Sequence, residues 1–175
     1  MSIRIEHELV IHRPQGDVFD FVSDHDHLPA WTKGVSRSKR TTPGPIGVGT
    51  TYAVVGRTLG RRVESTYELT EFKPVSGFSG RLESKLFSID ETYRFEGDAA
   101  QTTIRLTADA TPGRLLRLLG PFLGLAVDRQ IKLDHQRLKT ILERNRRRGT
   151  PRPPRRPGAA RPAAQEPAAA PATEG

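Results

Sequence analysis

The order of residue patterns along this chain constrains its fold more than any single motif does. An alternating segment at residues 3–11 precedes the segment Asp17–Trp31, which has the spacing of short helices. A long run of strand-like patterns follows, and the last periodic segment is an amphipathic helix. This order predicts an α+β chain in which a curved sheet grips the closing helix over an internal pocket. A pocket of this kind indicates that the chain binds something apolar.

Alternation of apolar and polar residues places the strands along the chain. Pro14 ends the first strand and suits the first turn of the helix that follows it. Leu59–Arg61 has the composition of a tight hairpin turn. The strands expected from this alternation cover residues 3–11, 50–58, 62–72, 77–83, 87–95 and 102–110.

The closing helix is expected from Phe122 to about Arg146. Its apolar positions recur at helical spacing and are Leu123, Val127, Ile131, His135, Leu138 and Leu142. From Thr150 onward the chain has no aromatic residue and no Leu, Ile, Val or Met. Such a segment buries too little apolar surface to offset the entropy of ordering it. We therefore predict one folded domain over residues 1–147 and a disordered tail rich in Arg, Pro and Ala over residues 148–175.

The charge of the chain says little about the ligand of the folded domain. The net charge is +8, and eight arginines against Glu166 and Glu174 lie from residue 144 onward, so the excess belongs mostly to the tail. The absence of cysteine excludes disulfides and thiolate chemistry. The N-terminal residues lack the apolar core of a signal peptide, and the apolar stretch Leu115–Val127 is too short to span a bilayer. We expect a cytoplasmic protein without stable membrane insertion, and the sequence does not indicate its oligomeric state.

Four segments resemble one known superfamily. They are HRPQGDVFDFVSDHDHLPAW, VESTYELTEFKP, DETYRFEG and GRLLRLLGPFLGLAVDRQIKLDHQRLKTILER, and they occur in the expected order over residues 1 to about 145. With these segments the chain resembles the SRPBCC superfamily, which has the START-like or Bet v 1-like helix-grip fold. More narrowly, it is similar to bacterial polyketide cyclase/dehydrase-like and lipid-transport-like proteins.

The resemblance implies a seven-stranded, curved antiparallel sheet around the long C-terminal helix, with two short helices after the first strand. It also implies a cavity between the sheet and the last helix. It does not supply catalytic residues, because no catalytic motif of a characterised branch is present, and we expect no cofactor. Members of this superfamily bind ligands or act as enzymes, so the fold alone does not fix the function.

Three polar side chains are expected to face this cavity if the alternation holds. They are His7 on the first strand, Tyr67, and Glu91, which is in register with Tyr93 and Phe95. A carboxylate facing an apolar cavity is suited to general acid or base work, with His7 as its partner. The alternative is that Glu91 reaches solvent, since a slip of one residue moves it to the other face, while His7 is a hydrogen-bonded core residue.

Trp31 is the only tryptophan and lies beside Leu28 and Pro29. It is expected at the cavity mouth, either as core or as a stacking surface for a ligand. His135 belongs to the apolar series of the last helix and either faces the cavity or is a satisfied core histidine. The predicted ligand-binding residues are Trp31, Tyr67, Glu91, Tyr93, His7 and Phe95, and the catalytic candidates are Glu91 and His7.

The run from Asp24 to His27 alternates aspartate with histidine, and both residue types bind metals. Adjacent residues on one turn do not easily converge on one ion, so no metal site is expected here. Asp24 is instead expected to cap the next turn.

Two basic segments are candidates for contact with anionic surfaces. Arg114 and Arg117 lie in a leucine-rich stretch that either touches a membrane surface or packs as ordinary core with snorkelling arginines. The arginine-rich tail either makes weak contact with nucleic acid or an anionic bilayer, or it is a solubilising segment. It has no interleaved aromatic residues for stacking on bases, so sequence-specific recognition is not expected.

Three functional hypotheses follow. The leading one is non-covalent binding, with possible transport, of a lipid, isoprenoid or polyketide in the cavity. The second is a polyketide cyclase/aromatase or dehydratase-like enzyme, in which Glu91 or His7 moves a proton and Tyr67 or Arg94 stabilises an enolate. The third is docking of the basic tail on nucleic acid or an anionic membrane. The sequence leaves open whether the chain is an enzyme.

Overall fold

The computed structural model describes residues 2–58, 60–118 and 122–147. The predicted disordered tail, residues 148–175, lies outside the described residues. The elements run in the order β1 (Ile3–Ile11), α1 (Gln15–Ser23), the 3₁₀ turn η1 (His25–His27), α2 (Leu28–Trp31), β2 (Val35–Arg40), β3 (Thr51–Thr58), β4 (Arg61–Lys73), β5 (Gly77–Ser84), β6 (Phe87–Gly97), β7 (Thr102–Pro112), α3 (Arg114–Arg117) and α4 (Phe122–Arg147).

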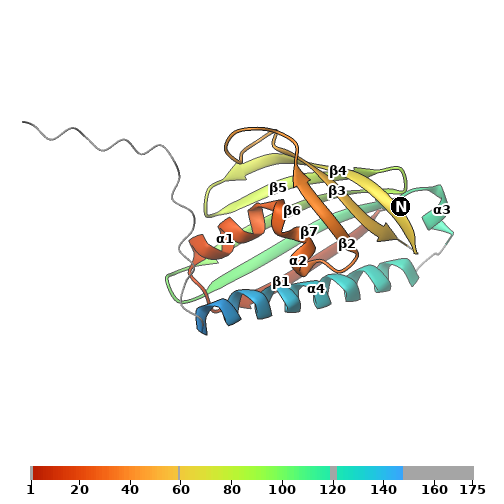
Figure 1. Cartoon of the computed structure of the whole chain (residues 1–175). Helices are drawn as coiled ribbons and strands as arrows, with labels where there is room; N and C mark the ends of the chain where they lie inside the picture. The colour runs from red at the N-terminus through yellow and green to blue at the C-terminus, as the bar shows by residue number, and fades with distance from the viewer. Residues whose placement is uncertain (1, 59, 119–121, 148–175) are drawn as a thin grey trace, which may run out of the picture.

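The seven strands form one antiparallel sheet in the order β1-β7-β6-β5-β4-β3-β2. From β3 to β7 each strand pairs with the next one in the chain, and β1 returns to the far edge beside β7. The sheet curves around α4, and the short helices α1 and α2 cover the rest of its concave side (Figure 1). This confirms the predicted helix-grip architecture, including the short helices after the first strand.

The strict alternation in β7 shows why one face of the sheet becomes the core. Thr102, Ile104, Leu106, Ala108 and Ala110 are buried, and the residues between them are not. Successive side chains of a strand point to opposite faces, so these five point toward the helices. Burying each large apolar side chain contributes roughly 1.5–3 kcal/mol, and the same pattern in β4 and β6 extends this face across the sheet.

β2 is the one strand that residue alternation did not place. Its sequence VSRSKR has a single apolar residue, and only Ser38 of its six residues is buried. It is an edge strand that pairs with β3 alone, with a register shift between Val35 and Arg37. Its position is decided by backbone pairing rather than by burial of an apolar face, and the seventh strand was expected only from the family resemblance.

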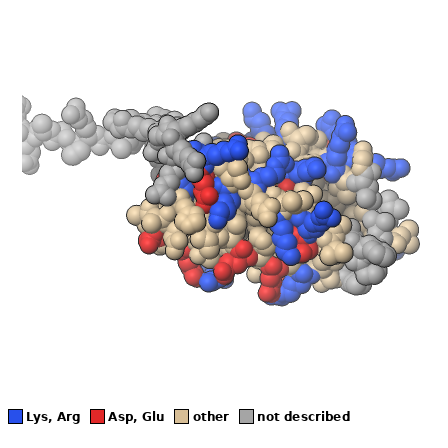
Figure 2. All heavy atoms as spheres, turned by 90° about the horizontal axis from the view of Figure 1, so that it is seen from below, with Lys and Arg blue, Asp and Glu red and all other residues tan. Residues whose placement is uncertain are grey.

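The outer face of α4 is basic. Arg129, Lys132, Arg137 and Arg144 are exposed on this helix, whereas its Asp134 is buried. Figure 2 shows this side of the molecule, with Lys and Arg spread over much of it. Within the described parts of the chain, no helix combines the length and the apolar character needed to cross a bilayer.

Candidate functional site

A cavity of about 220 Å³ lies between the concave face of the sheet and α4. Ile5, Ala108 and Ala110 line it from the sheet, and Val127 and Ile131 line it from α4. Residues of α1, η1 and α2 complete the lining and include Val22, Leu28 and Trp31. Apolar side chains make up most of this wall, which is the ordinary character of a small-molecule site.

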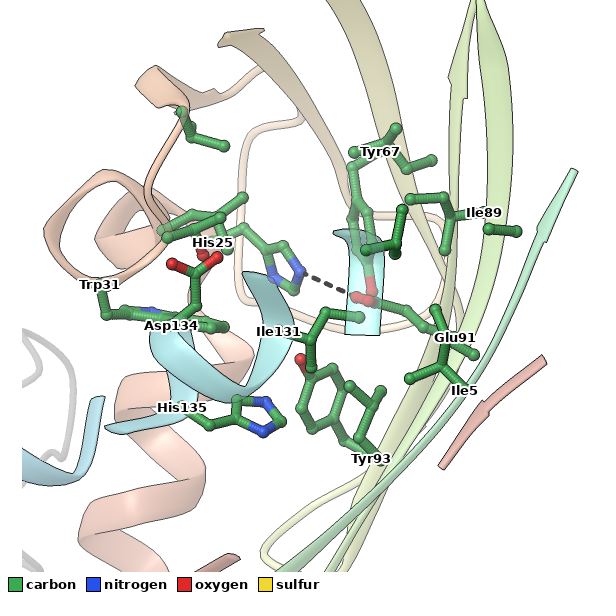
Figure 3. A pocket seen from close by; sticks show the side chains of 18 of the residues that line it. Ile5, His25, Trp31, Tyr67, Ile89, Glu91, Tyr93, Ile131, Asp134 and His135 are labelled. Carbon is green, nitrogen blue, oxygen red and sulfur yellow. Dashed lines mark ion pairs between the residues drawn. The ribbon is translucent and has the colours of Figure 1, made fainter. Parts of the chain in front are cut away.

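A few polar side chains interrupt the apolar wall. His25 comes from η1, Tyr67 from β4, Glu91 and Tyr93 from β6, and Asp134 and His135 from α4; all six line the cavity (Figure 3). They lie far apart in the sequence and meet because the sheet curves around α4. A small number of convergent polar groups in an apolar cavity fixes the orientation of a bound ligand.

His25 and Glu91 form the one ion pair drawn within the cavity (Figure 3). Nε2 of His25 lies 3.7 Å from Oε1 of Glu91, and the His25 side chain is 3% exposed. Nδ1 of His25 lies 3.2 Å from the carbonyl oxygen of Ser23, which only accepts, so Nδ1 carries a hydrogen. Nε2 is therefore the nitrogen that faces Glu91.

Tyr67 lies flat against His25 and points its hydroxyl toward Glu91 (Figure 3). The ring centroids of Tyr67 and His25 are 3.9 Å apart, and the planes are tilted by 25°. The hydroxyl oxygen is buried. Burial, then the charge of Glu91 and the hydrogen bond with its carboxylate, raise the pKa of the Tyr67 phenol well above its ordinary value, so the hydroxyl stays a donor.

A glycine makes room for this arrangement. A Cβ atom at Gly80 would overlap the Tyr67 hydroxyl and ring. Gly80 pairs with Glu91 across β5 and β6 and with Leu69 across β4 and β5. The phenol therefore reaches Glu91 by crossing the bare backbone of β5.

Tyr93 directs its hydroxyl into the cavity from β6 (Figure 3). It is 5% exposed and stacks on Phe78 with ring centroids 5.0 Å apart. Burial, followed by the charges of Glu91 and Asp134, raises the pKa of the Tyr93 phenol well above its ordinary value. At neutral pH this side chain is a second donor available to a ligand.

Asp134 places a second carboxylate at the opposite wall. Its Oδ1 accepts hydrogen bonds from the backbone nitrogen of Lys33 at 2.9 Å and from Nε2 of Gln130 at 2.8 Å. Burial raises the pKa of Asp134, and these two bonds together with the charges of Arg137 and Lys33 oppose that rise. The bond to Lys33 joins the segment that follows α2 to α4.

His135 is held by His7 of β1. Their Nδ1 atoms are 2.6 Å apart, so one imidazole donates and the other accepts. Burial, and next the neighbouring His7, lowers the pKa of His135 to about 4. Burial also lowers the pKa of His7, with the charge of Lys132 adding to this effect and Asp128 opposing it. Both imidazoles are therefore uncharged at neutral pH.

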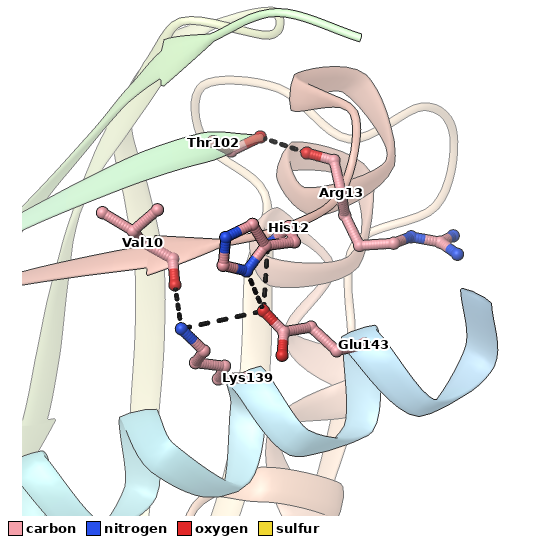
Figure 4. Close-up of polar contacts among 6 residues, drawn as sticks. All are labelled: Val10, His12, Arg13, Thr102, Lys139 and Glu143. Carbon is pink, nitrogen blue, oxygen red and sulfur yellow. Dashed lines mark hydrogen bonds and ion pairs between the residues drawn. The ribbon is translucent and has the colours of Figure 1, made fainter. Parts of the chain in front are cut away.

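The far end of α4 is anchored to β1 by polar contacts (Figure 4). Glu143 Oε1 accepts from the backbone nitrogen of His12 at 3.0 Å and lies 2.9 Å from Nδ1 of His12. Lys139 Nζ donates to the carbonyl oxygen of Val10 at 2.7 Å. These contacts fix the register between helix and strand, which sets the distance between the two walls of the cavity.

Four of the six predicted ligand-binding residues line the cavity: Trp31, Tyr67, Glu91 and Tyr93. His7 and Phe95 are on the concave face as expected but are not among the lining residues. His7 is covered by α4 through His135, and Phe95 is covered by Phe19 of α1, with ring centroids 5.4 Å apart. The expected pairing of Glu91 with His7 is corrected, because the imidazole beside Glu91 belongs to His25.

The structure also places the remaining residues that the sequence analysis considered for the site. Arg94, a candidate for stabilising an enolate, is exposed on the opposite face of β6. Asp24 caps η1 as predicted, because its Oδ1 accepts from the backbone nitrogen of Asp26. The four residues of the Asp24–His27 run diverge: Asp26 accepts from the backbone nitrogen of Arg40, and His27 stacks on Phe21.

Comparisons with known proteins agree with this geometry. The family model described as "Polyketide cyclase / dehydrase and lipid transport" matches residues 2–143. The chain belongs to this family. Membership makes it a hydrophobic ligand-binding or polyketide cyclase-type protein of the SRPBCC superfamily. No curated protein matches the sequence.

Three solved structures illustrate the shared fold. The Zhui aromatase/cyclase from Streptomyces sp. R1128 is 15% identical, with a TM-score of 0.69 over 83% of this chain and 96% of that one. A START superfamily protein from Mycobacterium smegmatis is 10% identical, with a TM-score of 0.69 over 81% and 97% of the two chains. Ara h 8.0201 is 13% identical, with a TM-score of 0.64 over 83% and 100%. At these identities the likeness concerns the fold alone.

Proposed function

We propose that this protein binds a small hydrophobic molecule, such as a lipid, isoprenoid or polyketide, in the cavity between the sheet and α4. The observation that carries the proposal is the cavity itself, an apolar chamber in which polar side chains converge at a few points. The family match over residues 2–143 supports the same conclusion. Transport is the natural use of such binding when the molecule is poorly soluble.

Affinity in this cavity comes mainly from removing apolar surface from water. That contribution is roughly 25 cal/mol per Å² of buried apolar surface, before the costs of association are subtracted. Trp31, Tyr67, Phe87 and Tyr93 supply aromatic surface to the wall, and aromatic edges and faces contact ring-shaped molecules well. Glu91 and the tyrosine hydroxyls then select an orientation.

The test is to fill the cavity and measure ligand binding. Ala108 is 3% exposed, lines the cavity and pairs with Glu91 across β6 and β7. An Ala108→Phe variant should abolish the rise in melting temperature that a panel of hydrophobic compounds gives the wild type. Ala53→Phe, at an exposed position of β3, is the matched control and should keep that rise. Equal responses in both variants would place the ligand outside the cavity and contradict the proposal.

Catalysis is the second candidate, as a polyketide cyclase/aromatase or a dehydratase-like enzyme. The observation in its favour is the His25–Glu91 pair, which puts a proton carrier inside the cavity next to two phenols. Here His25 takes the place that was expected for His7. Glu91→Gln should reduce turnover of polycarbonyl substrates by about a hundredfold or more. Glu96→Gln, at an exposed position of the same strand, is the control. Unchanged turnover in Glu91→Gln would remove the proposed catalytic role.

Weak contact with an anionic surface is a third candidate, proposed for the basic tail. The exposed arginines of α4 (Arg129, Arg137 and Arg144) support it, because they add positive charge to the domain beside that of the tail sequence, whereas Lys132 is paired with Asp128. Binding to anionic vesicles or to nucleic acid should weaken steeply with salt and should fall when residues 150–175 are removed. Cavity binding should survive the same truncation. Binding to either surface that does not change on truncation would exclude a role for the tail.

A further inference from the structure

A second hollow lies on the outer side of α4, away from the cavity. It is an open groove of about 760 Å³ between α4 and the end of α2, which lie side by side (Figure 1). Ala30 of α2 and Leu133 and Ile141 of α4 give it an apolar lining. Leu133 is 45% exposed, so this apolar side chain is open to water. The groove shares no lining residue with the cavity.

The residues of α4 that line the groove follow one stripe of the helix. They lie at positions 133, 136, 137, 140, 141 and 144, which is the i, i+3, i+4, i+7, i+8 and i+11 spacing of a single helical face. At 1.5 Å per residue this stripe is about 16 Å long, the length of roughly three helical turns. A groove of this shape accommodates a second helix laid along α4.

The groove has a basic rim, made of Lys33, Arg137 and Arg144. All three line the groove and are exposed, and no acidic residue belongs to the lining among the described residues. Lys33 follows α2, whereas the two arginines are two turns apart on α4. The positive charge is therefore present on both sides of the groove and along its length.

The acidic residues of α4 do not neutralise this rim. Asp128 pairs with Lys132 at 2.8 Å, and Oε1 of Glu143 lies 2.9 Å from Nδ1 of His12. Asp134 is 5% exposed and lines the cavity instead. Within the described part of α4, no carboxylate is thus left to cover the rim, and a partner has to supply the negative charge.

The lining favours a protein helix over other anionic partners. A bilayer surface is flat and does not enter a groove. The lining contains no aromatic side chain for stacking on the bases of a nucleic acid. Apolar side chains bordered by cations complement instead a helix whose apolar stripe is bordered by carboxylates.

We propose that the groove between α2 and α4 binds an acidic amphipathic helix of a partner protein. Apolar side chains of that helix contact Leu133 and Ile141, and its carboxylates pair with Lys33, Arg137 and Arg144. This site adds a protein partner to the ligand binding proposed above and does not depend on it.

The test uses two synthetic peptides of equal composition and the full-length protein at physiological ionic strength. The peptide EELLEELLEELLEE gathers its leucines on one helical face, and its isomer LEELELEELELEEL spreads them around the helix. Fluorescence anisotropy of the labelled peptides measures both dissociation constants. We expect the first peptide to bind about tenfold more tightly, because only it presents an apolar stripe to the groove. The isomer measures the unspecific attraction of glutamates to the arginine-rich tail.

Matched variants of α4 locate the site. Arg137→Glu should weaken binding of the first peptide by about tenfold or more, because it puts a like charge opposite the glutamates. Arg129→Glu makes the same charge change outside the groove and should weaken it by less than about twofold. Leu133→Ser should weaken binding by about fivefold, and Leu125→Ser, at a more exposed leucine outside the groove, should not.

Several results would overturn the proposal. They are the absence of saturable binding of the first peptide, equal affinities for the two peptides, and equal losses in Arg137→Glu and Arg129→Glu. If Arg137→Glu instead weakens binding to phosphatidylglycerol vesicles or single-stranded DNA while the first peptide does not bind, the groove recognises anionic surfaces and the proposal is wrong.

The cavity serves as the internal reference for these variants. Arg137→Glu and Leu133→Ser should keep the rise in melting temperature that hydrophobic compounds give the wild type, because neither residue lines the cavity. A retained rise shows that each variant is folded, so a loss of peptide binding is assigned to the groove. A failure of peptide binding in the wild type leaves the proposed cavity function standing.

Discussion

Nε2 of His25 and Oε1 of Glu91 face each other at 3.7 Å inside an otherwise apolar cavity, one from the turn after α1 and the other from the middle of β6. The sheet carries the carboxylate, and a short 3₁₀ turn carries the imidazole. The contact therefore depends on how η1 lies over the concave face. A substitution that moves η1 or β6 should therefore alter the environment of the side chains packed around this pair, such as Tyr67.

The first prediction concerns the three tyrosines, which are all buried. Burial raises the pKa of Tyr52 to about 12 and raises the pKa of Tyr67 and Tyr93 well above the ordinary value of 10. Tyrosinate absorbance of the folded protein should therefore rise only well above pH 10. Glu91→Gln should lower the titration midpoint, because the Glu91 charge contributes to two of the three shifts. A native titration centred near 10 would contradict the burial of these hydroxyls.

The same shifts predict the stability of the protein in alkali. Each folded-state phenol has a pKa above the unfolded value of 10, so its contribution is complete below that pH and is lost as the pH rises further. At pH values between its unfolded-state and folded-state pKa, each phenol should lower the free energy of unfolding by about 1.4 kcal/mol per pH unit. Urea unfolding at a series of alkaline pH values measures the slope. Tyr52→Phe should reduce this slope. A free energy of unfolding that does not change with pH in this range would show that folding does not raise the phenol pKa values.

The second prediction concerns the buried hydroxyl of Tyr67 beside Glu91. Tyr67→Phe removes the donor that faces this carboxylate, so the free energy of unfolding should fall by about 1–3 kcal/mol. Chemical denaturation at neutral pH measures this. An unchanged or higher free energy of unfolding would show that the Tyr67 hydroxyl does not stabilise the Glu91 carboxylate.

The third prediction concerns acid stability and the His7–His135 contact. The folded-state pKa of His135 is about 4, against 6.5 for the free side chain. The contribution of the uncharged imidazole to the free energy of unfolding is therefore complete above pH 6.5 and is lost as the pH falls toward 4. The loss from His135 is about 3 kcal/mol at most. His135→Phe should flatten this part of the profile, and the exposed His27→Gln should not. Equal slopes in wild type and His135→Phe would contradict a buried, uncharged imidazole.

The fourth prediction tests the space over Gly80. A Cβ atom at this position overlaps Tyr67, so Gly80→Ala should displace the phenol, lower the free energy of unfolding by about 1–3 kcal/mol and weaken ligand binding. Gly16→Ala in α1 is the control, since a Cβ atom there meets nothing within 4 Å. That variant should gain roughly 0.4–1 kcal/mol from reduced freedom of the unfolded chain. Unchanged stability and binding in Gly80→Ala would show that Tyr67 does not occupy this position.

Much of the fold was predictable because burial follows a simple period in most elements. Alternation identified the buried positions of β7, such as Ile104 and Leu106, and helical spacing identified Leu138 and Leu142 of α4. β2 gave no such signal, because its pairing partner rather than apolar burial determines its position.

The cavity was harder to predict from the sequence than the sheet. Alternation put His7 and Phe95 on the correct face, but it does not specify which residues of that face α1 and α4 cover. His25 lies in a 3₁₀ turn, where no period distinguishes it from His27 two residues later. Its burial depends on Tyr67 and Phe78, with ring centroids 3.9 Å and 5.8 Å from its own. Asp134 had a usable signal, since it follows Ile131 by three residues on the inner face of α4.

The most direct test of ligand binding is native mass spectrometry of the purified wild-type protein, with the co-purifying small molecules extracted and identified. Ala108→Phe, purified in the same way, is the comparison. We expect the wild type to carry a non-covalently bound hydrophobic molecule, released on denaturation, and the filled variant to carry none. A wild-type protein that carries no such molecule, and whose melting temperature no hydrophobic compound raises, would rule out ligand binding in this cavity.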